Sequence, residues 1–273
     1  MPRISGWKKP GSMEIVFILL GALMLLFIFA PPLKTVFSSS PGTLWNTLLE
    51  EDVYSSVLLT ICAALTATLI GLFLGVPLAY LLARHQFRGK RFVEAIIDVP
   101  IVIPHSAAGV ALLFVFGSNF LFGKILNGIG IGFFRSFTGV VIAMMFVSVP
   151  FLIDAAKEGF KAVDVRMEKI ARTLGASAWS SFFRVSLPLA WRSIFSGSVL
   201  MWARGLSEFG AIIIIAYSAS FLGWNPKVLP VLVANRFDFG LEYALPVAAI
   251  SIIISLVVFV GLRSIAYRGE KPS

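Results

Sequence analysis

Two ionisable residues of opposite charge, Arg204 and Glu208, lie four positions apart in the largely apolar sequence WARGLSEFGA. On a helix this spacing puts both side chains on one face, with Ser207 beside them. Ionisable groups inside a bilayer are costly and rarely face lipid. We expect the two residues to neutralise each other and hold their helix against a neighbour. A compatible alternative is that Arg204, oriented by Glu208, lines a pathway where it helps an anion to pass or closes a gate. A third is that Arg204 lies at the lipid edge.

A second polar group follows two prolines in another apolar stretch, where Pro100 and Pro104 precede His105 and Ser106. Each proline removes a backbone donor and disturbs the preceding helical turn. Within a bilayer such a break is tolerated where it faces protein or a water-filled cavity, so these side chains are expected to line a cavity, unless the break is a simple packing kink. Ser148 adds a hydroxyl beside a proline in a third stretch. The candidate pathway or gate residues are Pro104, His105, Ser106, Ser148, Arg204, Ser207 and Glu208.

Several kinds of catalytic and cofactor site are not indicated by the sequence. The nearest approach to a phosphate-binding loop, residues 117–124, has one residue too many and is followed by Ile125 instead of a hydroxyl. The two histidines, His85 and His105, form no HExxH pattern, and one cysteine cannot form a metal-binding cluster. No Gly-x-Ser-x-Gly sequence occurs. We therefore predict no catalytic residues, no metal site and no cofactor bound by this chain. If ATP is used, another chain must bind it.

Between two apolar stretches lies a polar segment, about residues 158–188, with a helix–Gly–helix pattern. Its apolar residues recur at helical spacing, and charged residues occupy the other faces. They are Val163, Met167, Ile170 and Leu174. Gly175 permits a positive-φ helix end, and Ser177 is placed to cap a second short helix that runs until Pro188. A short helix projecting from a membrane domain can transmit force; the alternative is an amphipathic helix lying on the membrane surface.

The composition is that of a membrane protein, with 58% hydrophobic and 14% charged residues and a mean hydropathy of +0.91. Apolar stretches of about 20 residues predict an all-α protein with about six transmembrane helices. They lie near residues 13–30, 53–83, 92–116, 138–157, 190–217 and 241–262. We expect one transmembrane domain over 1–273, with a retained N-terminal helix and a core over about 53–262. Small residues at every fourth position, Ala67, Gly71, Gly75 and Ala79, predict close helix packing, within the subunit or at a dimer seam.

Charge placement predicts the orientation of these helices. Most of the 23 Lys and Arg residues lie in the N-terminal segment, the loop at 84–91, the 157–192 region and the C-terminus. By the positive-inside rule these parts face the cytoplasm, so both termini are expected there. The net charge of +9 is then mainly a topology signal in a multi-pass cytoplasmic (inner) membrane protein, and nucleic-acid binding is not expected.

The segment KIARTLGASAWSSFFRVSLP, residues 169–188, resembles the EAA signature of ABC-importer permeases. That pattern is Glu-Ala-Ala-x₃-Gly-x₉-Ile-x-Leu-Pro. Here Gly175 and Leu187-Pro188 keep the spacing, Val185 stands at the Ile position, and the first Glu is replaced by Lys169, with Glu168 one residue upstream. The resemblance implies that the segment docks on an ATPase subunit, with Ala171 and Leu174 giving contact area and Arg172 a polar anchor. The candidate docking residues are Glu168, Lys169, Ala171, Arg172, Leu174, Gly175, Ala176 and Ser177.

Three segments together, WARGLSEFGA, PIVIPHSAAGVALLF and ARTLG followed by SLPLA, resemble permeases for molybdate or tungstate, and sulfate permeases share close versions. The resemblance implies a type I ABC-importer fold and a homodimer of this subunit. It further implies two ATPase subunits that bind ATP and Mg, an extracytoplasmic solute-binding protein, and transport by alternating access. The alternatives are a sulfate or thiosulfate permease, and an ATP-independent secondary transporter, for which no convincing internal repeat is found.

Overall fold

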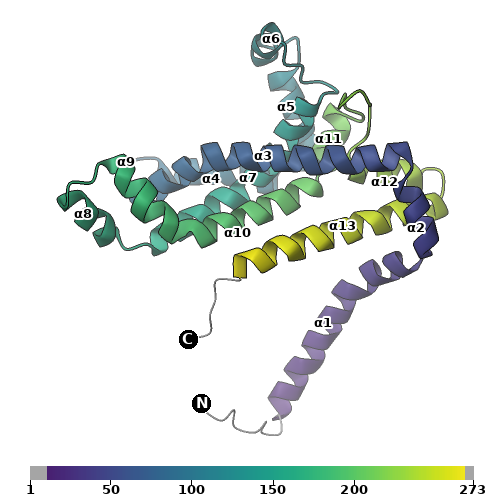
Figure 1. Ribbon diagram of the computed structural model, residues 1–273, viewed down its shortest axis with the longest axis horizontal. Helices are drawn as coiled ribbons and strands as arrows, with labels where there is room; N and C mark the ends of the chain where they lie inside the picture. The colour runs from purple at the N-terminus through teal and green to yellow at the C-terminus, as the bar shows by residue number, and fades with distance from the viewer. Residues whose placement is uncertain (1–10, 268–273) are drawn as a thin grey trace.

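The structure is a computed structural model that describes residues 11–267, and it is almost wholly helical (Figure 1). Over that range the only β pairing is two isolated bridges. The helices are α1 (Ser12–Phe37), α2 (Pro41–Leu48), α3 (Glu51–Arg84), α4 (Lys90–Val102), α5 (His105–Phe116), α6 (Leu121–Gly128), α7 (Phe137–Ala162), α8 (Val165–Thr173), α9 (Ala178–Ser181), the π-helix η1 (Phe182–Ser186), α10 (Leu187–Leu206), α11 (Gly210–Ile215), α12 (Leu229–Phe237) and α13 (Leu241–Tyr267). The predicted all-α fold is confirmed.

The core of the molecule is formed by α3, α7 and α10, which run side by side along its long axis (Figure 1). Their close approach depends on the small residues at every fourth position of α3, all of which are buried. A Cβ atom on Gly71 would lie 2.5 Å from Met201 Cε of α10, and one on Gly75 would lie 3.2 Å from Ile153 Cγ1 of α7. The small-residue pattern therefore packs helices within the subunit, one of the two expected uses.

Two of the expected spans are not straight helices. The 92–116 stretch is divided into α4 and α5, which are bent by 115° relative to each other. Ile103, at the break, is extended because the following residue, Pro104, disfavours helix at the position before it. The 190–217 stretch is divided at residues 207–209 into α10 and α11. Both breaks fall where the sequence places its polar side chains.

Four helices within the described range are long and apolar enough to cross a membrane, namely α1, α3, α7 and α13 up to Gly261. The bent pair α4 and α5 makes a fifth span if it is counted as one. Helix α10 is less apolar because it carries Arg192 and Arg204. With α10 as the sixth, these helices agree with the expected number of about six.

The segment between α7 and α10 lies at one end of the long axis, opposite α2 and α12 (Figure 1). The Asp164 side chain caps α8 by accepting from the Arg166 amide at 2.9 Å, and Ser177 accepts from the Ser180 amide at 3.1 Å. Gly175 has φ of +90°, so the predicted turn and the predicted cap are both confirmed. The expected helix end at Pro188 is wrong. Pro188 lies in the first turn of α10, where its missing N–H is tolerated, and η1 joins α9 to α10.

Helix α1 is apolar along its length, yet none of its residues is buried. It contacts α13, and its N-terminal end lies away from the bundle (Figure 1). Most of the basic residues that predict the location of the termini lie outside the described residues, namely Arg3, Lys8, Lys9, Arg268 and Lys271.

Candidate functional site

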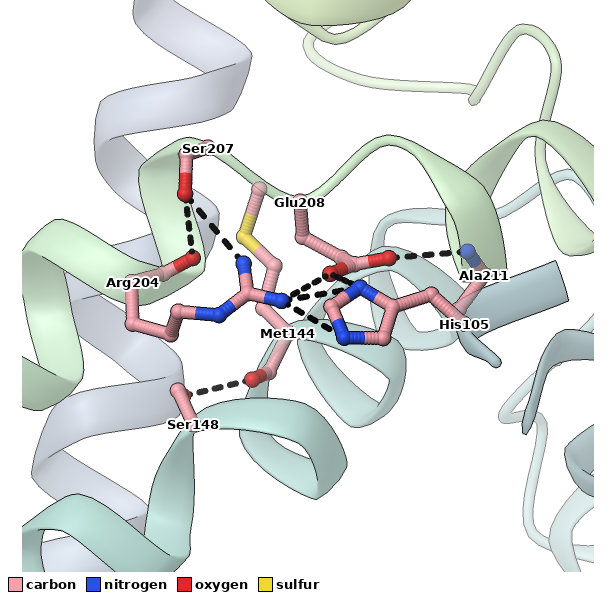
Figure 2. Close-up of polar contacts among 7 residues, drawn as sticks. All are labelled: His105, Met144, Ser148, Arg204, Ser207, Glu208 and Ala211. Atoms are coloured by element: carbon pink, nitrogen blue, oxygen red, sulfur yellow. Dashed lines mark hydrogen bonds and ion pairs between the residues drawn. The ribbon is translucent and has the colours of Figure 1, made fainter. Parts of the chain in front are cut away.

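The two helix breaks meet at a cluster of three ionisable side chains, His105, Arg204 and Glu208 (Figure 2). His105 is the first residue of α5, Arg204 lies in the last turn of α10, and Glu208 lies between α10 and α11. The two segments come together because α5 packs against α11. Residues separated by about a hundred positions in the sequence therefore form one polar site.

Arg204 and Glu208 are paired, as the spacing of four predicts. Arg204 Nη2 lies 3.2 Å from Glu208 Oε2, and it also lies 2.8 and 2.9 Å from the two ring nitrogens of His105. His105 Nδ1 is 2.9 Å from the same Glu208 oxygen. The other carboxylate oxygen of Glu208 accepts a hydrogen bond from the Ala211 amide at 2.8 Å. Every polar atom of the fully buried Glu208 side chain thus has a partner, as a buried carboxylate requires.

The two nitrogen-containing side chains of the cluster are only partly covered. The side chains of Arg204 and His105 are 24% and 32% exposed, whereas that of Glu208 is 0% exposed. The cluster is therefore partly accessible at its Arg204 and His105 side chains, while the carboxylate of Glu208 is enclosed. Such a surface attracts an anion, but Glu208 partly neutralises Arg204 and weakens that attraction. The arrangement suits brief contact with a passing anion better than tight binding.

The remaining candidate residues of the pathway divide into two groups. Ser207 belongs to the cluster because its hydroxyl accepts from Arg204 Nη1 at 3.2 Å and donates to the Arg204 carbonyl at 3.0 Å. Pro104 and Ser106 flank His105 and are exposed. Ser148 is buried and donates to the carbonyl of Met144 in its own helix (Figure 2). Its hydroxyl therefore does not take part in the His105–Arg204–Glu208 contacts.

Two glycines that the sequence did not single out allow α5 and α11 to approach each other. A Cβ atom on Gly210 would lie 2.7 Å from His105 Cβ, and one on Gly109 would lie 2.7 Å from the Ala211 carbonyl oxygen. Either contact is shorter than side chains adopt, so both positions require glycine for the observed packing. In the sequence, Gly109 follows His105 and Gly210 follows Glu208 within a few residues. A glycine in the sequence does not reveal which distant residue packs against it, so this close contact was not predicted.

Gly210→Ala is expected to destabilise the protein by about 1–3 kcal/mol, because the added methyl group must push His105 away from its partners. The measurement is the apparent melting temperature of the purified protein in detergent. Gly21→Ala is the matched control, since Gly21 is also helical and has no atom within 4 Å of its would-be Cβ. Equal melting temperatures for the Gly210 variant and the wild type would contradict the close-packing argument.

The predicted docking residues lie mostly on the outside of the segment at the end of the molecule. Lys169, Arg172, Leu174, Gly175 and Ser177 are exposed, and Ala171 and Ala176 are half-buried. Most of the apolar stripe also faces outward, because Met167, Ile170 and Leu174 are 49%, 55% and 83% exposed. Glu168 differs from this group, since it is buried and faces the transmembrane helices. An exposed apolar stripe of this kind is typical of a site that interacts with another protein or with a membrane.

Comparisons with known proteins agree with these features. Residues 71–268 match the family model described as "Binding-protein-dependent transport system inner membrane component". The molybdate/tungstate transport system permease protein of Thermococcus kodakarensis is 42% identical over 252 residues, which cover 91% of this chain and 94% of that protein. A probable sulfate transport system permease protein of Chlorokybus atmophyticus is 32% identical over 246 residues, which cover 88% and 85%.

The fold is similar to that of solved transporters. The structure of a bacterial ABC transporter involved in alginate import superimposes with a TM-score of 0.66 at 18% identity, covering 94% of this chain and 96% of that one. The methionine ABC transporter MetNI in an inward-facing conformation gives 0.62 at 13% identity, covering 85% and 100%. At such identities the likeness concerns the fold alone, and the sequence matches identify the family. The chain therefore belongs to the binding-protein-dependent transport system inner membrane components, with the fold of an ABC-importer permease.

Proposed function

We propose that this chain is the transmembrane permease subunit of an ATP-driven importer for molybdate or tungstate. The observation that carries this proposal is the 42% identity, over nine-tenths of the chain, to a permease whose name gives these two anions. Sulfate is the second candidate substrate, supported by the more distant relative at 32% identity. Molybdate, tungstate and sulfate are tetrahedral dianions of similar shape, so the fold of the permease does not by itself tell which of the three anions is transported.

In this proposal the cluster of His105, Arg204 and Glu208 lies on the anion pathway, with Ser207, Ser106 and Pro104 beside it. The partly exposed side chain of Arg204 gives a passing dianion a guanidinium as hydrogen-bond donor, and the partly exposed His105 lies beside it. Glu208 limits the net positive charge, so that the anion is released again. A strongly held anion would leave slowly, and we therefore place selectivity mainly in a separate solute-binding protein.

The surface formed by α8 and the following turn is proposed to dock in a groove of an ATPase subunit. The supporting observation is the exposure of Ile170 and Leu174 on a helix at the end of the molecule, where it projects beyond the core helices (Figure 1). Gly175 allows close approach at the turn, and Arg172 supplies a polar anchor. Glu168 takes no direct part in this contact because its side chain is buried.

A complete importer of this kind requires further chains. We propose a second copy of this subunit, two ATPase subunits that bind ATP and Mg at the α8 end, and a solute-binding protein at the α2 and α12 end. The unburied apolar surface of α1 supports a membrane environment in which lipid or the second copy covers it. The basic residues of the loop at 84–91 and of α8 support the proposal that the α8 end and both termini face the cytoplasm.

The proposed function is tested by transport into proteoliposomes that contain the permease and its ATPase, with the solute-binding protein added outside. Uptake of labelled molybdate and tungstate is expected to require ATP hydrolysis, and an excess of sulfate should compete poorly. A nonhydrolysable ATP analogue is the control. Preferred uptake of sulfate would replace the substrate assignment, and undiminished uptake with the analogue would indicate a secondary transporter.

A further inference from the structure

Helix α8 is attached to the transmembrane helices through one side chain, that of Glu168. It is the only residue of Val165–Thr173 that is buried, whereas the apolar side chains of this helix face outward. Glu168 lies in the first turn of α8, where a negative charge also suits the helix dipole. The position of α8 relative to the core therefore depends on what Glu168 contacts.

The partner of Glu168 is Arg84, the last residue of α3. Arg84 Nη2 lies 2.6 Å from Glu168 Oε1, and the two side chains are only 7% and 12% exposed. Arg84 Nε donates to the same oxygen at 2.7 Å. The guanidinium also donates to the carbonyls of Phe160 at 2.8 Å and Val163 at 3.1 Å. Because carbonyls at a helix end lack helical partners, Arg84 joins the end of α7 to both α3 and α8.

A third residue completes the contact. Tyr80, one turn before Arg84 in α3, donates from its hydroxyl to Glu168 Oε2 at 3.0 Å. Its ring packs edge-on against Phe160 of α7 and Phe182 of η1, with centroids 5.2 and 4.9 Å apart. Burial alone would raise the pKa of Glu168, but the neighbouring Ser186 hydroxyl and the hydrogen bonds from Arg84 and Tyr80 lower it below its usual value. The carboxylate is thus ionised at neutral pH, and both of its oxygens are held by α3.

Helix α3 extends from this contact to the far end of the molecule. It runs without a break from Glu51 to Arg84. Four buried residues in its first half pack in one cluster with Leu206, at the end of α10 beside the Arg204 cluster, and they are Leu59, Ala63, Ala64 and Ala67. It also contacts α12, since Thr60 accepts from the Leu229 amide at 2.8 Å. A displacement of α8 that moves Arg84 is therefore passed along a continuous helix to the break that carries the candidate pathway residues.

We infer that the buried Arg84–Glu168 pair, with Tyr80, is the joint that transmits movement of α8 to α3. This inference rests on the proposed docking of α8 on an ATPase. In it Arg84, Glu168 and Tyr80 are positioning residues, which touch neither the anion nor the ATPase. Helix α8 also contacts η1, where the Ser186 hydroxyl lies beside Glu168, and it is connected along the chain at its two ends, one of which contains the Gly175 turn. A joint made of three short polar contacts to Glu168 holds α8 in a fixed orientation, which a chain connection does not.

The test uses the assembled permease–ATPase complex in proteoliposomes, with three measurements: ATPase retained on purification, ATP hydrolysed, and labelled tungstate transported. Glu168→Gln keeps the shape of the side chain and removes its charge. It is expected to retain the ATPase and its hydrolysis but to lower tungstate transported per ATP at least about fivefold, the lower range of coupling between sites. Glu158→Gln is the matched control, because Glu158 pairs with Lys161 at 2.8 Å on the exposed surface nearby. It should leave the ratio unchanged.

Two further variants keep the inference falsifiable if Glu168→Gln fails to fold. Tyr80→Phe removes one hydrogen bond and keeps the ring packing, so a smaller fall in the same ratio is expected. Arg84→Gln combined with Glu168→Gln should lower the ratio no more than the worse single variant, since both disable one joint. An unchanged ratio of tungstate transported per ATP in Glu168→Gln or in folded Tyr80→Phe would overturn the inferred role of the joint but leave docking intact. Loss of the ATPase from Glu168→Gln would instead overturn the inference by making Glu168 a docking residue. Absence of ATPase from the wild-type complex would contradict the proposed function itself.

Discussion

Gly175→Asp is expected to lower retention of the ATPase on the purified permease by at least about tenfold, which corresponds to about 1.4 kcal/mol of binding free energy. Gly175 has φ of +90° and no atom within 4 Å of its would-be Cβ. The added side chain therefore meets nothing within the chain but projects into the proposed docking surface beside Leu174. A charge placed at a closely packed interface, without a partner, costs affinity. The measurement is the ratio of ATPase to permease after affinity purification in mild detergent.

The control for this variant is Gly130→Asp. Gly130 has φ of +80° and is likewise without neighbours within 4 Å of a would-be Cβ, but it follows α6 rather than α8. Both substitutions impose the same kind of backbone strain, so a difference between them reports on the surface and not on the turn. We expect normal membrane insertion for both variants and normal ATPase retention for Gly130→Asp. Equal retention by the two variants would remove the docking assignment.

Arg204→Ala is expected to destabilise the permease by about 3–5 kcal/mol, because it leaves the fully buried Glu208 carboxylate without its guanidinium partner. Transport should fall as well, since the donors that face the proposed pathway are lost. Lys161→Ala is the control: it removes a cation from an exposed pair with Glu158, and a loss below about 0.5 kcal/mol is expected. Thermal unfolding in detergent ranks the variants.

The double variant Arg204→Ala/Glu208→Ala separates pairing from a role in transport. When both charges are removed, no buried carboxylate remains uncompensated, so the double variant should be more stable than Arg204→Ala. Transport should nevertheless remain low, because the donors on the pathway are still missing. Additive losses of stability would show that the two residues are not coupled. Recovery of transport together with stability would show that the cluster has a structural role only.

The features that the sequence predicted well are those with local causes. A helix spanning a membrane requires a continuous apolar stretch, so α1, α3, α7 and α13 were predictable from composition alone. The spacing of four between Arg204 and Glu208 predicted their pairing. Although α10 ends at Leu206, Glu208 follows it closely enough to remain within reach of Arg204 in the last turn. The turn at Gly175 and the cap at Ser177 were predictable for the same reason, since each depends on the residue itself and its nearest neighbours.

The features that the sequence did not predict depend on contacts between distant segments. Helical periodicity showed that α8 has an apolar stripe, but the stripe faces outward while Glu168 faces inward. Proline positions indicated a break near residue 104, but not the bend of 115°. Sequence alone determined which long apolar stretches form helices and which side chains are polar within them. Only the tertiary structure decided that His105 completes the Arg204 cluster and that Arg84 holds Glu168. The physical reason is that periodicity assigns a residue to a face of its own helix, whereas the packing of other helices determines which residues that face contacts.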